Sequence, residues 1–356
     1  MIHRRHFLGS MAAASLAGAT TSNLFANPID SSTSKALKWR CDIVSTIAHG
    51  YAKRAPVVTG VSLQPTSNFS KGNLVAIAGD DHYVCIYDMQ KKEFEKHIGE
   101  HTDWIRATSF SPDGRYLASA GNDRKLRLWN AQDWNEKPRT IRHREAIIDI
   151  AFSNDSSKIA TVGFESALRV YNTQTGQQLF SRHCMCSDNH AIAFSPDDQM
   201  LAAGGRSGEI CIWDVNGNKI STFKSHRKRI RSVLFAGDDK VISCSDDQMV
   251  KITNAKNPSD TQALPRHASK LYDILLLDDD VLATAGSDNI IHIWRISDLT
   301  ELGVLKGHTG TVTSLSTSET KLASGSYDTQ VRIWERDNQL GRDRQTQLPG
   351  WNGKHQ

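Results

Sequence analysis

The chain has 356 residues, of which 38% are hydrophobic and 23% are charged, and its formal net charge is +4. This composition is typical of a soluble globular protein that can bury a sizeable core, and it excludes wholesale disorder. Residues 1–26 contain Arg4 and Arg5 but no Lys, Asp or Glu, so the rest of the chain carries only +2. A charge this small does not indicate nucleic acid or an anionic membrane as a partner.

The first 26 residues have the features of a targeting segment rather than of a folded element. Arg4 and Arg5 precede His6, Phe7 and Leu8, an order that resembles the twin-arginine export signal of bacteria. The apolar run that follows is too short to span a bilayer, which takes ~20 apolar residues. The resemblance implies an exported protein of the periplasm or the medium, with cleavage after Ala26 or Ala19. The alternative is a disordered basic leader of a cytoplasmic protein.

From residue 38 onward the sequence repeats itself. An aromatic residue, or once a threonine, ends a short apolar run seven times, at separations of 42, 42, 42, 40, 41 and 40 residues. These residues are Tyr87, Trp129, Tyr171, Trp213, Thr253, Trp294 and Trp334. Seven units of nearly constant length indicate one repeat architecture rather than several domains.

Each unit also carries a polar marker six residues before the aromatic position and a histidine further upstream. The markers are Asp81, Asp123, Glu165, Ser207, Asp247, Asp288 and Asp328, and the histidines are His49, His101, His143, His183, His226, His267 and His308. The pattern resembles the WD-repeat (WD40) family, whose units form four-stranded propeller blades. The resemblance covers about residues 38–335.

The predicted fold is therefore all-β, a seven-bladed β-propeller of four-stranded antiparallel blades. Short β-branched runs separated by polar turns agree with it, and no helical periodicity is sustained. No good strand follows Trp334, so we expect the segment from Trp39 to Ile47 to complete the last blade and close the ring. The predicted organisation is a signal peptide (1–26), a linker (27–37), the propeller (38–335) and a polar tail (336–356).

The recurring histidine, hydroxyl and aspartate resemble a nucleophilic triad, but they occur in three blades, and a catalytic site is rarely made three times in one ring. The resemblance implies that these side chains bond one another and the blade's tryptophan, so that buried polar groups are satisfied. The three predicted networks are His101, Ser119, Asp123 and Trp129; His267, Thr284, Asp288 and Trp294; and His308, Ser324, Asp328 and Trp334.

Four blades depart from this pattern. Blade one has Ile77 and Tyr87, blade three Glu165 and Tyr171, blade four Ala203 and Ser207, and blade five Thr253 in place of tryptophan. Blades one and four should therefore depend more on apolar packing and on their neighbours.

The six cysteines have two interpretations. Cys85, Cys211 and Cys244 stand inside apolar runs and are predicted to be buried small hydrophobes. His183, Cys184, Cys186 and His190 gather in one loop and could offer soft metal ligands, but their spacing does not match the usual zinc pattern. We therefore predict no metal there and no cofactor elsewhere; a reactive thiol pair is the other alternative.

The resemblance also suggests where a partner would bind, because the family places its usual contacts three residues after the histidine or one before the aspartate. Those positions hold Trp104, Arg229, Lys270 and Thr311 in the first set and Asn122, Arg206, Asp246 and Tyr327 in the second. Arg206, Arg229 and Lys270 would form a positive patch across three blades, suited to an acidic segment.

The sequence lacks the motifs of several enzyme classes: C-x-x-C-H, G-x-G-x-x-G, the P-loop, G-x-S-x-G and the EF-hand loop are all absent. We predict a non-catalytic exported scaffold that binds a protein or peptide at the propeller's rim. The alternative is a propeller hydrolase or lactonase, which would gather carboxylates and histidines at one mouth of the central channel.

Overall fold

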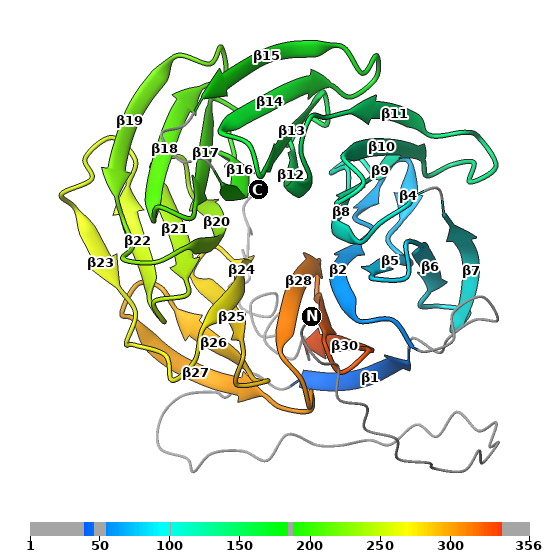
Figure 1. Cartoon of the computed structure of the whole chain (residues 1–356). Helices are drawn as coiled ribbons and strands as arrows, with labels where there is room; N and C mark the ends of the chain where they lie inside the picture. The colour runs from blue at the N-terminus through cyan, green and yellow to red at the C-terminus, as the bar shows by residue number, and fades with distance from the viewer. Residues whose placement is uncertain (1–38, 46–54, 100, 184–187, 337–356) are drawn as a thin grey trace, which may run out of the picture.

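The computed structural model describes residues 39–45, 55–99, 101–183 and 188–336. These residues form seven four-stranded antiparallel sheets and a short two-stranded hairpin, with no helix among them. Figure 1 shows the seven sheets arranged as blades around a central channel. The predicted seven-bladed propeller is confirmed. The predicted signal peptide and linker lie outside the described residues.

The blades follow one another along the chain, each from its innermost to its outermost strand. Blade one comprises β2 (Val58–Leu63), β5 (Leu74–Gly79), β6 (Val84–Asp88) and β7 (Glu93–Ile98). Blade two comprises β8 (Ile105–Phe110), β9 (Tyr116–Gly121), β10 (Lys125–Asn130) and β11 (Arg139–Arg142). Blade three comprises β12 (Ile147–Phe152), β13 (Lys158–Gly163), β14 (Ala167–Asn172) and β15 (Gln178–His183).

The second half of the ring repeats this order. Blade four comprises β16 (Asn189–Phe194), β17 (Met200–Gly205), β18 (Glu209–Asp214) and β19 (Lys219–Lys224). Blade five comprises β20 (Ile230–Ala236), β21 (Lys240–Ser245), β22 (Val250–Asn254) and β23 (Thr261–Ala263). Blade six comprises β24 (Leu271–Asp278), β25 (Val281–Gly286), β26 (Ile291–Arg295) and β27 (Thr300–Leu305).

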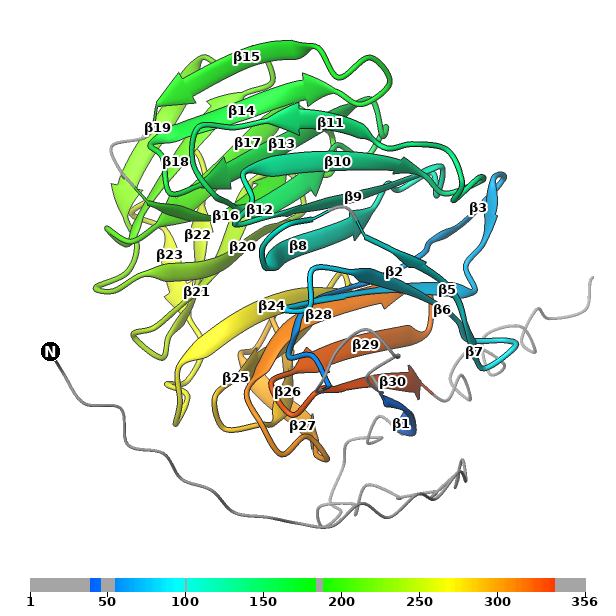
Figure 2. The same ribbon diagram turned by 45° about the vertical axis from the view of Figure 1, so that its right-hand side comes forward.

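Blade seven joins the two ends of the described chain. It comprises β28 (Val312–Ser318), β29 (Lys321–Ser326), β30 (Gln330–Arg336) and, as its outermost strand, β1 (Trp39–Ser45). β1 pairs antiparallel with β30 along all seven of its residues, from Trp39 opposite Arg336 to Ser45 opposite Gln330. Figure 2 shows β1 beside β30. The predicted closure by an N-terminal strand is therefore confirmed, because this strand pairs an edge that would otherwise be exposed.

The longer connection in blade one forms an additional hairpin rather than an irregular loop. Its two strands are β3 (Thr66–Ser67) and β4 (Ser70–Lys71), and β3 projects from the blade in Figure 2. The connection between β2 and β5 lies at the end of the blade opposite to the turn between β5 and β6, because adjacent strands are antiparallel. The tip residue Phe69 is exposed at this opposite end.

Six of the seven turns at the polar markers share one backbone conformation. The residue after the marker has a positive φ in five blades, as in Arg124 (62°) and Thr329 (68°), and blade four has Gly208 there (75°). A glycine before the turn is explained by close approach, because a Cβ on Gly121 would lie 2.1 Å from the carbonyl oxygen of Trp104. These turns and the segments that enter the innermost strands form one end of the ring, which we call the turn face.

The core lies between blades rather than inside them. Each of seven apolar clusters in the described residues combines side chains of two neighbouring blades, and the cluster between blades three and four includes Leu168, Leu201 and Trp213. All six residues of β17 are buried, because a blade packed on both faces has no solvent side. Ile77 and Ala203 are buried in such clusters, as expected for blades one and four.

Candidate partner-binding site

Two of the three predicted side-chain networks are complete. In blade seven, His308 Nε2 lies 2.8 Å from Ser324 Oγ, His308 Nδ1 lies 2.9 Å from Asp328 Oδ2, and Trp334 Nε1 donates to Ser324 Oγ at 2.9 Å. These distances fit an imidazole that donates from Nδ1 to the carboxylate. Although burial opposes it, the bond from His308 lowers the pKa of Asp328 to about 2.

Blade two has the same arrangement with an additional cation. His101 Nε2 lies 2.8 Å from Ser119 Oγ, and Trp129 Nε1 donates to the same oxygen at 2.9 Å. Asp123 is shared between His101 Nδ1 at 3.1 Å and Arg127 Nη1 at 3.0 Å. Ser119 is fully buried with its oxygen engaged twice. The geometry therefore supports a structural role for this serine instead of a nucleophilic one.

The network predicted for blade six is wrong at the aspartate. His267 Nε2 lies 3.0 Å from Thr284 Oγ1, to which Trp294 Nε1 donates at 3.2 Å, as expected. Asp288 instead lies 3.2 Å from His292 Nε2, and His267 Nδ1 has no partner within the described part of the chain. Burial first, and then the neighbouring His292, lowers the pKa of His267 to about 4.

The blades with an incomplete pattern use substitutes that the sequence did not reveal. In blade three, Arg169 forms an ion pair with Glu165, and the Tyr171 hydroxyl lies 3.2 Å from His143 Nε2. Blade five keeps its histidine network without tryptophan, because His226 lies 2.9 Å from Ser243 Oγ and 3.1 Å from the Asp247 carboxylate. Thr253 there accepts a hydrogen bond from Thr261 at 3.1 Å.

The weak metal candidate is not assembled by the residues that the structure describes. Cys184 and Cys186 lie outside the described residues. His183 ends β15 and bonds Ser166 at 3.0 Å, whereas His190 lies on β16 with Nε2 2.7 Å from Asp188 Oδ1. The described ranges contain no group of three His, Cys, Asp or Glu residues arranged to hold a metal ion.

The three cysteines that were predicted to be buried are buried, but they differ in whether the sulfur is a free thiol. Cys85 and Cys244 are buried free thiols, and burial raises the pKa of Cys85 to about 12. Cys211 is also buried, but it is disulfide-bonded. The predicted burial of Cys211 in an apolar cluster is therefore confirmed, and its disulfide bond is a feature that the sequence did not predict.

The eight predicted partner contacts lie on the turn face, and six of them form three backbone-bonded pairs. The backbone N–H of Asn122 donates to the Trp104 carbonyl at 2.9 Å, that of Asp246 to Arg229 at 3.0 Å and that of Tyr327 to Thr311 at 3.0 Å. In blade four, the backbone N–H of Arg206 donates to the Asp188 carbonyl. In blade six, the backbone N–H of Ser287 donates to the Lys270 carbonyl.

The eight side chains differ in how free they are to contact a partner. Trp104 and Tyr327 are 42% and 47% exposed, and Arg206 and Lys270 are exposed as well. Arg229 forms an ion pair with Asp188 at 3.2 Å. The positive patch predicted from Arg206, Arg229 and Lys270 is therefore weaker at its centre than the sequence suggested.

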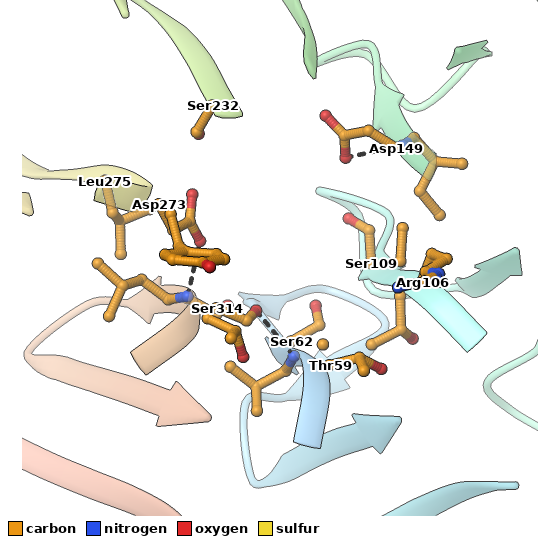
Figure 3. Close-up of a pocket in the computed structure, with 18 of the residues that line it drawn as sticks. Thr59, Ser62, Arg106, Ser109, Asp149, Ser232, Asp273, Leu275 and Ser314 are labelled. Carbon is orange, nitrogen blue, oxygen red and sulfur yellow. Dashed lines mark hydrogen bonds between the residues drawn. The ribbon is translucent and has the colours of Figure 1, made fainter. Parts of the chain in front are cut away.

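Sequence reasoning did not identify the residues that line the central channel. A cavity of about 710 Å³ opens between the innermost strands, and Arg106, Arg231, Tyr272, Asp149 and Asp273 are among its lining residues. Figure 3 shows Asp149 and Asp273 on different sides of this space. One signal was available, because the channel residues hold fixed positions in the innermost strands. The second residue of such a strand is Arg106, Arg231 or Tyr272, and the third residue is Asp149 or Asp273.

The channel carboxylates hold neighbouring blades together. Asp149 Oδ2 accepts the N–H of Ile192 in blade four at 2.9 Å, and Asp273 Oδ2 accepts that of Leu315 in blade seven at 2.7 Å. Their other oxygens accept the N–H of the residue that follows each aspartate, at 2.9 Å in both cases. Ser314 bonds Val61 in the same way at 3.0 Å. Burial raises the pKa of Asp149 to about 7 and that of Asp273 to about 6.

Four segments of the chain match the family described as "WD domain, G-beta repeat": residues 92–130, 178–214, 217–254 and 299–335. Four WD repeats are present. They lie within a ring of seven blades, and two of them contain the complete networks of blades two and seven. Propellers of this kind are generally scaffolds for protein interaction and are typically non-catalytic.

Curated relatives match parts of the chain at low identity. Protein tipD of Dictyostelium discoideum is 27% identical over 153 residues, which cover 42% of this chain and 25% of that protein. Apoptotic protease-activating factor 1 of Rattus norvegicus is 29% identical over 144 residues, which cover 39% of this chain and 11% of that protein. The DENN domain and WD repeat-containing protein SCD1 of Arabidopsis thaliana is 25% identical over 166 residues, 45% and 14% of the two chains.

The chain thus spans a quarter or less of these three relatives. All three are eukaryotic proteins and give no support to a bacterial origin, which stays a prediction. Among the described residues, no helix is long and apolar enough to cross a bilayer.

Proposed function

We propose that this protein is a non-catalytic exported scaffold that binds a protein or peptide partner through the turn face of its propeller. One observation carries the proposal. Of the eight large hydrophobic side chains that are exposed in the described residues, four lie on the turn face: Tyr83, Trp104, Phe164 and Tyr327. Large exposed apolar groups that gather on one face mark an interaction surface.

The turn face has two halves of different chemistry. Its exposed aromatic side chains come from blades seven, one, two and three, which are consecutive in the ring. The exposed cations Arg206 and Lys270 come from blades four and six, with Arg227 and Lys228 of blade five between them. This division favours a partner that places an acidic segment over blades four to six and buries an apolar side chain beside Trp104 or Tyr327.

The geometry does not favour the alternative of a hydrolase or lactonase. The hydroxyl groups of the blade networks are buried and engaged. Asp149 and Asp273 line the channel, but every oxygen of both carboxylates accepts a backbone N–H. These carboxylates connect neighbouring blades, whereas the alternative needs free acid and base groups at one mouth of the channel.

Export is a separate part of the proposal. It rests on Arg4 and Arg5 in the leader, and the disulfide-bonded state of Cys211 supports it, because disulfides persist in oxidising compartments. Replacing both arginines by lysine should abolish translocation by a pathway that carries folded cargo. The measurement is fractionation of the producing cells, and a double variant that still leaves the cytoplasm would contradict the twin-arginine assignment.

The binding proposal is tested by a pull-down from native envelope extract with residues 27–356 as bait, followed by surface plasmon resonance with the captured partner. Trp104→Ala should mainly speed dissociation, and Arg206→Ala with Lys270→Ala should slow association and weaken its salt dependence. Phe69→Ala is the matched control, because Phe69 is an exposed aromatic at the opposite end of blade one. Wild-type rates for all three variants would place binding on another surface.

A further inference from the structure

Four side chains from four different blades line the channel where it opens on the turn face. Arg106 lies on β8, Arg231 on β20 and Tyr272 on β24, while Tyr327 lies in the turn between β29 and β30. All four line the same cavity. Burial and the neighbouring Tyr272 raise the pKa of Tyr327, whereas Arg106 and Arg231 oppose this shift.

The two arginines are held in place but keep donors available. Arg106 donates from Nε to Asn122 Oδ1 at 2.9 Å, and its guanidinium lies 5.1 Å from the centre of the Trp104 ring. Arg231 uses Nε and Nη2 for Asp246, at 2.8 and 3.1 Å, and lies 5.0 Å from the centre of the Tyr272 ring. Both Nη atoms of Arg106 and Nη1 of Arg231 bond no acceptor among the described residues.

The charges of this group do not cancel. Asp246 offsets Arg231, but no carboxylate of the described chain pairs with Arg106, so one positive charge is left at the channel mouth. Stacking and the Asn122 bond fix the plane of the Arg106 guanidinium before any ligand arrives, which lowers the entropy cost of binding. Deeper in the channel, Asp149 and Asp273 are occupied by backbone N–H groups.

We propose that Arg106, Arg231, Tyr272 and Tyr327 form a pocket that binds a carboxylate of the partner peptide, with Arg106 as its main cation. We call these four residues the carboxylate pocket. A planar guanidinium fork matches the two oxygens of a carboxylate, and the phenol hydroxyls add two further donors. The proposal rests on the proposed function, since it identifies which group of an acidic partner segment enters the channel.

The pocket also predicts what flanks that carboxylate. Tyr272, Tyr327 and the nearby Phe164 supply aromatic surface around the cavity. A volume of about 710 Å³ admits a few residues of an extended segment but no folded domain. The carboxylate should therefore come from an extended peptide with an apolar side chain next to the acidic residue.

The test is fluorescence anisotropy with three labelled hexapeptides: a glutamate hexamer with an amidated C-terminus, a glutamine hexamer with a free C-terminus, and the amidated glutamine hexamer. Residues 27–356 of the wild type should bind one of the first two and not the third. The glutamate hexamer identifies a side-chain carboxylate, and the glutamine hexamer with a free end identifies a terminal one. Absence of binding to both would overturn the carboxylate pocket, while the pull-down still decides the proposed function.

Variants separate the pocket from general attraction to a positive face. Arg106→Gln should weaken binding roughly tenfold or more, since a charge-assisted hydrogen bond is lost. Tyr327→Phe, which removes only a hydroxyl, should weaken it by a smaller factor and guards against misfolding of the arginine variant. Arg144→Gln is the matched control, because it removes an exposed arginine of the same face that does not line the cavity. Equal losses in the two arginine variants would overturn the pocket and leave only a diffuse positive surface.

Discussion

Blades six and seven both carry a histidine, a hydroxyl residue, an aspartate and a tryptophan at nearly the same spacing, but they connect them differently. In blade seven, Asp328 bonds His308 at 2.9 Å, and its side chain is 4% exposed. In blade six, Asp288 bonds His292 at 3.2 Å instead of His267, and its side chain is 19% exposed. The repeated motif therefore fixes which residues are present but not which of them bond.

The residue two positions before the tryptophan accounts for the difference. Blade seven has Arg332 there, which donates to the Gly307 carbonyl at 2.7 Å and leaves Asp328 to His308. Blade six has His292, whose Nδ1 lies 2.6 Å from Glu301 and whose Nε2 faces Asp288. Although burial opposes it, bonds to these two carboxylates raise the pKa of His292. A histidine between two acids thus competes with the histidine of the repeat.

The largest effect should come from removing the strand that blade seven takes from the N-terminal segment. Deleting residues 27–47 removes β1, which buries Val44 and pairs with β30 along seven residues. We expect the melting temperature to fall by roughly 10 °C or more, since several kcal/mol of packing and hydrogen bonding are lost. The measurement is differential scanning calorimetry.

The control for this deletion is the shorter removal of residues 27–37, which lie before β1. It should leave the melting temperature almost unchanged. If both deletions had the same small effect, ring closure by β1 would not contribute to stability.

The aspartates of the two blades give the next largest difference. Asp328→Ala should lower the free energy of unfolding by about 3 kcal/mol, because it leaves a buried histidine and a backbone N–H without a partner. Asp288→Ala should cost only about 1 kcal/mol, because its ion pair is partly exposed. Urea unfolding of the two variants measures both values, and equal losses would show that the different bonding has no energetic consequence.

Blade six can also be given the residue of blade seven. His292→Arg should free Asp288 to bond His267 Nδ1, and we expect the protein to gain about 1 kcal/mol in stability. The sharper measurement is a double-mutant cycle: Asp288→Ala should cost more in the His292→Arg background than in the wild type. An identical cost in both backgrounds would mean that Asp288 does not change its partner.

The smallest expected effect is the response of the two blades to acid. The pKa of His267 is about 4 in the folded protein and ~6.5 when unfolded, so its contribution is complete above pH 6.5 and is lost as the pH falls through 4. The pKa of Asp328 is about 2 against 3.8, so its contribution is lost only as the pH falls further, through 2. As the pH falls, the stabilisation from His267 in blade six should therefore be lost at a higher pH than that from Asp328 in blade seven.

Comparison of variants isolates these contributions, because other histidines titrate in the same range. Between pH 6.5 and 4, the free energy of unfolding of His267→Gln should change less with pH than that of the wild type. The slopes should differ by up to about 1.4 kcal/mol per pH unit. For Asp328→Asn, the free energy of unfolding should change with pH as in the wild type between pH 6.5 and 4. It should change less than in the wild type only below pH 4. A wild-type slope for His267→Gln would show that this histidine keeps its proton affinity on folding.

The sequence alone determined the number of blades, the closing strand and the complete networks of blades two and seven. The blades and the two networks depend on patterns that recur in units of about 40 residues, so local turns, apolar runs and paired polar groups are enough to predict them. The closing strand was predictable from a count of strands, because no good strand follows Trp334 in the sequence and the edge of blade seven would otherwise be unpaired. Trp39–Ser45 pairs with that edge.

Only the tertiary structure decided the channel and the exceptions. Arg106, Arg231, Tyr272 and Tyr327 are up to 221 residues apart in the sequence and meet only because the ring closes. The exchange of partners at Asp288 depends on Glu301, which reaches His292 from the neighbouring strand β27. Contacts of this kind are set by how strands and blades are placed against one another, and the repeat itself contains no record of them.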